Sequence, residues 1–401
     1  MTPPADPAPE PRCGAGGSTD PDLSAALRAA TDGALEALGP GGPPDLAVAF
    51  VGAAYGAAIR PAFEGLGELL PARTLIGTTA EGVLAGDVEH EGGPAVAVWA
   101  ARLPGGQVTP LALEHAQTPD GGTFVGWPAE LDDAWPAHAA VILLADPFSF
   151  PVEAFIERLA EDRPGVPILG GMASGAMVPA GNTLVCNAAT YDSGAVGVVV
   201  GGGVRVRPVV SQGCRPIGSP LVITRADANV ILELGGRPAL ERLREIYGGL
   251  TPADRGLVRS SLHVGRVASE YQAEFRAGDF LVRNVVGADP ESGAIAVGDL
   301  VRAGQTVQFH VRDAASAHDD LRHLLLSVRS AGIRPAGGLV FTCNGRGSHL
   351  FPEPHHDARC LQEALGPLPA AGFFAQGEIG PIGRRNCLHG FTASVALFEQ
   401  A

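Results

Sequence analysis

The 401-residue sequence contains no lysine, and arginine supplies all 28 of its basic side chains. The absence of lysine excludes Schiff-base catalysis and a phosphate-binding P-loop, because both depend on a lysine amine. The formal net charge is -15, and the arginines form no basic stripe of the kind that neutralises nucleic-acid phosphates. We therefore predict no nucleic-acid partner.

Long apolar runs are also missing. No stretch of 18 or more apolar residues lacks a charge or a turn signal, so we predict no membrane span and no membrane partner. The N-terminus has neither the basic region nor the apolar region of a signal peptide, and we expect a cytoplasmic protein. Residues 1–21 are rich in proline, glycine and aspartate, which predicts a disordered lead-in.

Cysteine is sparse, and the sequence contains no C-x-x-C pair. Both features argue against a disulfide framework and a structural zinc site. His356 and Cys360 are four residues apart and can share a helical face, but two ligands do not make a metal site. We predict no metal and no cofactor. Instead we interpret this segment as the polar start of a helix, with Asp357 in its first turn.

Glycine is abundant, and one glycine-containing phrase occurs three times. The phrase G-x-x-A-[E/S/Q]-G is found as GTTAEG (77–82), GGMASG (170–175) and GFFAQG (372–377). Each copy lies between two short apolar runs, which indicates an internal repeat of strand, helix, glycine loop and strand. The apolar runs do not alternate with polar residues, which is typical of strands that are buried on both faces.

The predicted fold class is α/β with mixed sheets and an embedded antiparallel β-rich segment. Apolar spacing predicts helices over 151–163 and near residue 360. Within the segment 201–336 we predict a helix over 228–249, broken at Gly235-Gly236, and an antiparallel meander over 279–313. Asp313 is expected to cap a further helix that runs through Arg329.

Five segments, in this order, resemble the FIST domain family. They are ILGGMASG (168–175), FHVRD (309–313), FTCNGRG (341–347), GFFAQGEIGP (372–381) and NCLHGFTASVALF (386–398). The resemblance extends over roughly residues 45 to 398. It implies a FIST N-terminal domain, assigned here to 22–235, and a FIST C-terminal domain, assigned to 236–401.

The resemblance further implies a bacterial, intracellular sensory module in signal transduction. The ligand class suggested for the family is a small molecule such as an amino acid or a related metabolite. The chain leaves no room for an F-box, kinase or methyl-acceptor domain, so its output is expected to pass through a separate signalling protein.

The segment CNGRG (343–347) ends an apolar strand, which is where open α/β sheets bind ligands. Gly345 and Gly347 would let backbone amides approach a ligand, and Arg346 would form a bidentate pair with a carboxylate. Cys343 and Asn344 complete this candidate ligand-binding loop. The alternative is a tight turn whose arginine makes a salt bridge at the surface.

Other candidate ligand contacts lie further along the chain. Gly377 and Glu378 follow the third glycine phrase, and Glu378 would meet an ammonium group. Asn386 and His389 would line the same pocket, at the point where the glycine phrases converge. The resemblance adds Arg312 as an anion contact. The alternative for Glu378 is a surface glutamate in a loop. The alternative for Asn386 and His389 is turn capping, and for Arg312 it is a strand-end salt bridge.

The sequence also leaves an enzymatic function open. Cys343 would be the nucleophile of a thiol-dependent hydrolase or transferase, with a histidine nearby in sequence as the base. Against this interpretation, the chain has no nucleophile elbow, no H-E-x-x-H motif and no phosphate loop. The sequence therefore favours a binding module over an enzyme.

Overall fold

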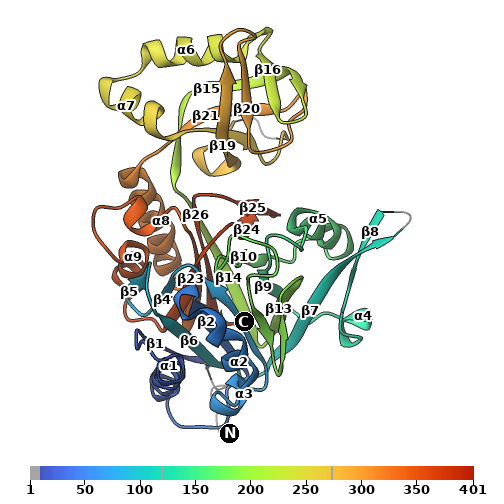
Figure 1. Ribbon diagram of the computed structural model, residues 1–401, viewed down its shortest axis with the longest axis vertical. Coiled ribbons are helices and arrows are strands. Elements are labelled where there is room, and N and C mark those ends of the chain that lie inside the picture. Colours follow the sequence, from blue (N-terminus) through green and yellow to red (C-terminus); the bar gives the residue numbers. More distant parts are fainter. Residues whose placement is uncertain (1–9, 119–120, 272–273) are drawn as a thin grey trace, which may run out of the picture. The chain divides into compact units, whose positions relative to one another are not determined.

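The computed structural model describes residues 10–118, 121–271 and 274–401 (Figure 1). The chain forms two compact units, each described by itself below. Unit 1 comprises Met1–Val210, Arg322–Leu388 and Ala393–Ala401, and unit 2 comprises Ser211–Leu321 and His389–Thr392. These limits follow contacts in space and differ from the sequence ranges 22–235 and 236–401, which stay a prediction.

Three mixed sheets form the described part of unit 1. In spatial order the first contains β1 (Arg12–Ser18), β6 (Val96–Arg102), β2 (Leu46–Gly52), β3 (Leu75–Ala80), β11 (Leu184–Cys186) and β12 (Ala189–Tyr191). The second contains β25 (Arg385–His389), β24 (Glu378–Ile382), β10 (Ile168–Met172), β9 (Ala140–Ala145), β13 (Ala195–Gly202), β7 (Gly106–Thr118) and β8 (Gly121–Val125). The third contains β14 (Val204–Gln212), β26 (Thr392–Gln400), β22 (Gly337–Cys343), β23 (Ala370–Ala375), β4 (Val83–Ala85) and β5 (Val88–His90).

The same three-strand arrangement stands at the centre of each sheet. The pairs β2–β3, β9–β10 and β22–β23 are parallel, and β6, β13 and β26 each add an antiparallel strand to the first member of a pair. The glycine phrases, which the sequence suggested to be loops, correspond mainly to the second strands β3, β10 and β23. The internal repeat itself stays a prediction.

Steric crowding explains why each phrase begins with glycine. A Cβ atom on the first glycine would collide with a carbonyl oxygen of the neighbouring parallel strand, in the pairs Gly77–Ala49, Gly170–Leu143 and Gly372–Val340. The glycines therefore permit close approach of two strands, and a chain turn is not their purpose.

A shared core fills the space between the three sheets. Phe50 of β2 stacks on Phe373 of β23, with ring centroids 5.2 Å apart, and Phe341 of β22 meets the edge of Phe373 at 5.9 Å. Trp99 of β6 packs on Phe398 of β26 at 4.7 Å. All five rings are almost entirely buried, so this aromatic cluster ties the first sheet to the third.

Helices cover the outer faces of the sheets. On the first sheet these are α1 (Leu23–Leu38), the 3-10 turn η1 (Ala53–Ala58), α2 (Ile59–Glu64) and α3 (Leu66–Leu69). The second sheet is covered by α5 (Val152–Asp162), with α4 (Glu130–Asp133) nearby in the chain. The remaining helices of this unit are α8 (Ala314–Ser330), which begins in unit 2, and α9 (His356–Leu365). The predicted helices at 151–163, near 360 and at 313–329 are confirmed.

The expected disordered lead-in is wrong for its described part. Arg12–Ser18 form β1, which pairs antiparallel with β6. Side chains at Gly14 and Gly16 would collide with the carbonyl oxygens of Ala34 and Ala30, so glycine here lets α1 pack directly on the strand. Residues 1–9 lie outside the described residues.

Unit 2 is built on one antiparallel sheet. Its strands are, in order, β15 (Cys214–Asp227), β21 (Thr306–Arg312), β18 (Leu262–Val267), β19 (Phe280–Asp289), β20 (Ala294–Val297), β16 (Val230–Leu234) and β17 (Arg237–Pro238). β15 also pairs with β16, which closes the sheet into a barrel. Helices α6 (Ala239–Gly249) and α7 (Pro252–Ser261) and the turn η2 (Ala277–Asp279) complete the unit.

The strands predicted over 279–313 are confirmed as β19, β20 and β21. The predicted meander holds only for β19 and β20, which pair antiparallel, because β21 pairs with β15 and β18 and not with β20. The predicted helix over 228–249 is wrong in its first half. Residues Val230–Leu234 form β16, because their apolar side chains complete the barrel core. Gly235 and Gly236, at φ of 59° and 78°, turn the chain into the short β17, and α6 follows. The α/β class with mixed sheets is confirmed.

Candidate functional site

The carboxyl ends of β22 and β23 lie side by side. The two strands are parallel, with Cys343 opposite Ala375, and the Asn344 amide donates to the Ala375 carbonyl over 2.9 Å. The Arg346 amide turns back to the Cys343 carbonyl at 2.8 Å, and the turn η3 (Gly347–His349) follows. The sequence-predicted loop therefore stands at a strand end, where α/β sheets place ligands.

Hydrogen bonds connect the three glycine phrases at this end of the sheets. The Glu81 amide donates to the Ser174 hydroxyl over 2.9 Å. The Met172 amide donates to the Gly377 carbonyl over 2.8 Å. Ser174 in turn donates its hydroxyl to the Phe374 carbonyl. The phrases thus converge in space, and Gly377 links the third phrase to the second.

Arg346 is fully buried, and its guanidinium is engaged within the protein. Its Nε and Nη2 donate to the two oxygens of Asp357, over 2.7 and 2.8 Å, and the Thr342 hydroxyl donates to the same carboxylate over 2.6 Å. Burial alone would raise the pKa of Asp357, but the Arg346 charge holds that pKa well below its usual range. The surface salt bridge considered as the alternative is therefore a buried one.

The predicted position of Asp357 in the first turn of α9 is confirmed. Asp357 is the partner of Arg346 because α9 begins beside the turn that carries Arg346. The bidentate geometry expected for a ligand carboxylate is instead satisfied by a carboxylate of the chain itself.

Two polar atoms in this loop have no hydrogen-bond partner among the described residues. They are the buried donor Nη1 of Arg346 and the buried acceptor Oδ1 of Asn344. Cys343, Asn344 and Gly345 are partly exposed, whereas Arg346 and Gly347 are buried. The loop therefore has a buried polar floor under a partly exposed rim.

Glu378 belongs to the same buried cluster. It begins β24, opposite Gly171 of β10, and its side chain is fully buried. Burial alone would lower the pKa of Arg346, but the Asp357 carboxylate, and more weakly Glu378, raise it. The alternative of a glutamate in a surface loop is therefore wrong.

Glu89 is a member of this cluster that sequence reasoning missed. It lies in the short strand β5, and its Oε1 accepts a hydrogen bond of 2.9 Å from the Ala358 amide near the start of α9. Burial first, and then the negative charge of Asp357, raise the pKa of Glu89 to about 8. No motif marks Glu89, because its neighbours are some 270 positions away in the sequence.

Cys343 is the one partly exposed cysteine among those described, and the other five are buried. The histidines closest to it in sequence have other contacts. The His356 ring stacks on Phe351 and its Nδ1 lies 2.9 Å from Asp357, and His355 accepts from the Glu89 amide over 3.1 Å. Among the described residues, no group of three or more His, Cys, Asp or Glu side chains is placed to hold a metal.

Asn386 has a structural contact away from the loop. Its Oδ1 accepts from the Ile168 amide over 2.9 Å, and its Nδ2 donates to the Val166 carbonyl over 2.8 Å. It thereby fixes β25 to the chain that enters β10.

Arg312 and His389 belong to unit 2. The Arg312 guanidinium carbon lies 5.3 Å from the Phe391 ring, and the His263 ring lies 4.4 Å from the same ring. His263 pairs across the sheet with His310, and both are buried. Burial lowers the pKa of both histidines to about 4, with the charge of Arg312 adding to the effect at His263.

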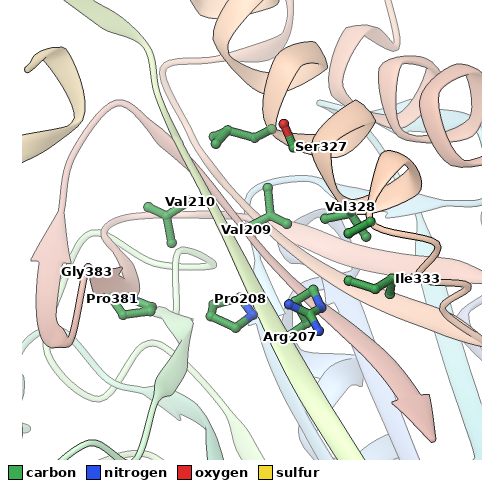
Figure 2. A pocket seen from close by; sticks show the side chains of 11 residues that line it. Arg207, Pro208, Val209, Val210, Ser327, Val328, Ile333, Pro381 and Gly383 are labelled. Atoms are coloured by element: carbon green, nitrogen blue, oxygen red, sulfur yellow. The ribbon is translucent and has the colours of Figure 1, made fainter.

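A cavity of about 410 Å³ opens beside β14 in unit 1 (Figure 2). Val209 of β14 lies on the side of the strand toward Val328 of α8 and the following Ile333, whereas Val210 lies on the opposite side, toward Pro381. Arg207 is the charged residue of the lining. No sequence motif marks this cavity, because its walls come from three segments that are distant from one another in the sequence.

Two family descriptions match the chain. The FIST N domain matches residues 45–237, and the FIST C domain matches residues 239–381. The chain belongs to the FIST family.

FIST proteins are associated with sensing in signal transduction, as the resemblance implied. The chain is similar to "Uncharacterized protein Rv0628c" of Mycobacterium tuberculosis (strain ATCC 25618 / H37Rv), with 44% identity over 96% of this chain and 99% of the relative. It is also similar to "Uncharacterized protein Mb0898c" of Mycobacterium bovis, with 42% identity over 96% of this chain and 98% of the relative. No helix in the described part of this FIST chain is long and apolar enough to cross a membrane.

Proposed function

We propose that this FIST protein is a cytoplasmic sensor that binds a small polar metabolite at the loop Cys343–Gly347. The observation that supports it most is the pair of unpartnered atoms, Arg346 Nη1 and Asn344 Oδ1, at the carboxyl ends of two parallel strands. A buried donor and a buried acceptor without partners are costly, and a ligand with complementary groups offsets that cost.

The chemistry of the loop suits a zwitterion such as an amino acid. A ligand carboxylate would accept from Arg346 Nη1 and from the backbone amides around Gly345 and Gly347. A ligand ammonium would donate to Asn344 Oδ1 and be attracted by the nearby Glu378 carboxylate. Because Asp357 already neutralises most of the Arg346 charge, a zwitterion fits better than a strong anion.

The signal would leave through a separate protein. A ligand that bridges Asn344 and Arg346 would tighten the link between β22 and α9, because Arg346 already holds Asp357 at the start of that helix. The exposed surface near α9 is therefore the region in which we expect a partner to detect the bound state.

Native mass spectrometry of the purified protein, followed by a thermal-shift screen over amino acids, tests the proposal. At about 100 times its dissociation constant a ligand adds roughly 2.7 kcal/mol to the free energy of unfolding, which raises Tm by a few degrees. Asn344→Ala should abolish the shift, and Gln400→Ala, which removes an exposed amide at the end of β26, should retain it. Flat melting curves together with no copurified small molecule would reject the proposal.

A thiol-dependent hydrolase or transferase remains the second candidate, since Cys343 is partly exposed and lies in the field of Arg346. It predicts that iodoacetamide labels Cys343 in the folded protein much faster than the five buried cysteines. Absence of selective labelling would remove the support for this function.

A further inference from the structure

The cavity beside β14 has the size and lining of a small-molecule site. Its volume of about 410 Å³ falls within the range of about 300–1,000 Å³ that is typical of ligand pockets. The walls come from β14, from the end of α8 and from the β24–β25 hairpin, and most of the lining side chains are apolar: Pro208, Val209, Val210, Leu324, Val328, Ile333 and Pro381.

One hydrogen-bond donor in this lining is unused. Arg207 Nη2 donates to Glu399 Oε1 over 2.8 Å, but the Nε of Arg207 is buried and has no acceptor among the described residues. The hydroxyl of Ser327, the other polar side chain of the lining, already donates to the His323 carbonyl over 2.8 Å. An occupant of the cavity is therefore expected to bring an acceptor to Arg207.

The charge of Arg207 is already compensated. The Glu399 side chain is only 9% exposed, so its carboxylate acts on Arg207 with little screening by water. A ligand carboxylate would place a second negative charge beside Glu399, and a ligand ammonium would meet the guanidinium. A neutral group with a carbonyl oxygen satisfies the free donor without either repulsion.

We propose that this cavity binds a neutral acyl compound, such as a short-chain amide, ester or lactone. The carbonyl oxygen accepts a hydrogen bond from Arg207 Nε, and the hydrocarbon chain lies against Val209, Val328 and Ile333. The inference does not depend on the proposed metabolite site at Cys343–Gly347, because the two sites share no residue.

The test compares three six-carbon probes with neutral, negative and positive head groups: hexanamide, hexanoate and hexylamine. Protein labelled with carbon-13 in its Val, Leu and Ile methyl groups is titrated with each probe and followed by NMR. Hexanamide should shift the methyl signals of Val209, Val210, Val328 and Ile333 and bind at least tenfold more tightly than the other two. Equal or tighter binding of hexanoate, or no shift with hexanamide, overturns the proposal.

Two sets of variants locate the binding. Ser327→Trp fills the cavity from the exposed face of α8 and should abolish the shifts, whereas Ser330→Trp, on the same helix but outside the lining, should retain them. In the double variant Arg207→Met with Glu399→Met, both charges leave together, so the fold should be preserved and the tenfold preference for the amide should disappear. Binding that survives Ser327→Trp, or a preference that survives the double variant, contradicts the assignment.

Discussion

The charged residues at the strand end of β22 show how burial decides what a side chain can do. Arg346 and Asp357 have lost nearly all contact with water, so each is tolerated only because the other is present. The CNGRG sequence indicated a bidentate arginine correctly, but it could not indicate which carboxylate the arginine meets. That choice depends on where α9 begins in space, and the residue spacing alone does not contain this information.

Asp357→Asn should lower the free energy of unfolding by about 3–5 kcal/mol, because it leaves the Arg346 cation buried and unpaired. Chemical denaturation in urea measures the loss. The matched change Asp162→Asn, in the exposed pair with Arg158, should cost less than about 1 kcal/mol. Replacing both partners, as Arg346→Met with Asp357→Leu, should recover most of the stability, and a double variant as unstable as Asp357→Asn would contradict this account.

Glu89 should make the protein less stable in alkali. Its folded-state pKa of about 8 lies above the ordinary value of 4.5, so the folded protein holds a proton that the unfolded chain has released. Below pH 4.5 protonated Glu89 makes its full contribution to the free energy of unfolding, and this contribution is lost as the pH rises through 8. Urea midpoints between pH 6 and 9 measure the loss.

Glu89→Gln keeps the shape and removes the titration, so the decline between pH 6 and 9 should become shallower. The exposed Glu353→Gln should leave the slope unchanged. A slope that is the same in wild type and Glu89→Gln would show that Glu89 is ionised in the folded state.

At the scale of elements, the sequence predicted some helices correctly, but half of the helix predicted over 228–249 is a strand, and the glycine phrases were predictable only in part. Helix α5 follows directly from the apolar spacing of Val152, Phe155, Ile156 and Leu159, all of which are buried. The phrases recur in the sequence, but their glycines look the same whether they form turns or permit close packing. Only the pairing of β22 with β23 distinguishes these cases, because it places the Val340 carbonyl against Gly372.

Gly372→Ala should therefore destabilise the protein by about 1–3 kcal/mol or more, since the new methyl group has no room beside Val340 and neither backbone can shift freely. Gly67→Ala provides the control, because a Cβ at this helical glycine meets no atom within 4 Å. The control should be neutral or stabilising by up to about 1 kcal/mol. Thermal melts compare the two, and similar Tm values would show that the phrases tolerate side chains.

At the scale of the whole molecule, each unit has a core of its own. The aromatic cluster around Phe373 lies in unit 1, and the barrel core around Phe309 lies in unit 2. The chain's three tryptophans, Trp99, Trp127 and Trp135, all belong to unit 1. Proteins with separate cores often unfold in more than one step, and here tryptophan fluorescence reports on unit 1 alone.

Unit 2 should lose stability in mild acid. His263 and His310 are buried and neutral with pKa values of about 4, whereas an unfolded histidine takes up its proton near pH 6.5. Their contribution is complete above pH 6.5 and is lost as the pH falls through 4, on the order of 3 kcal/mol for each histidine. As the pH falls from 6.5 to 4, amide hydrogen exchange should accelerate in β18 and β21 before the tryptophan fluorescence changes.

The double variant His263→Gln with His310→Gln removes both titrating groups. After correction for the intrinsic pH dependence of exchange, its amide exchange rates should depend less on pH between 6.5 and 4 than those of the wild type. His318→Gln, in the same unit, should behave as the wild type. Simultaneous loss of protection in β18 and in β2 would mean that the two cores unfold together, and an acid response that persists in the double variant would place its origin outside this histidine pair.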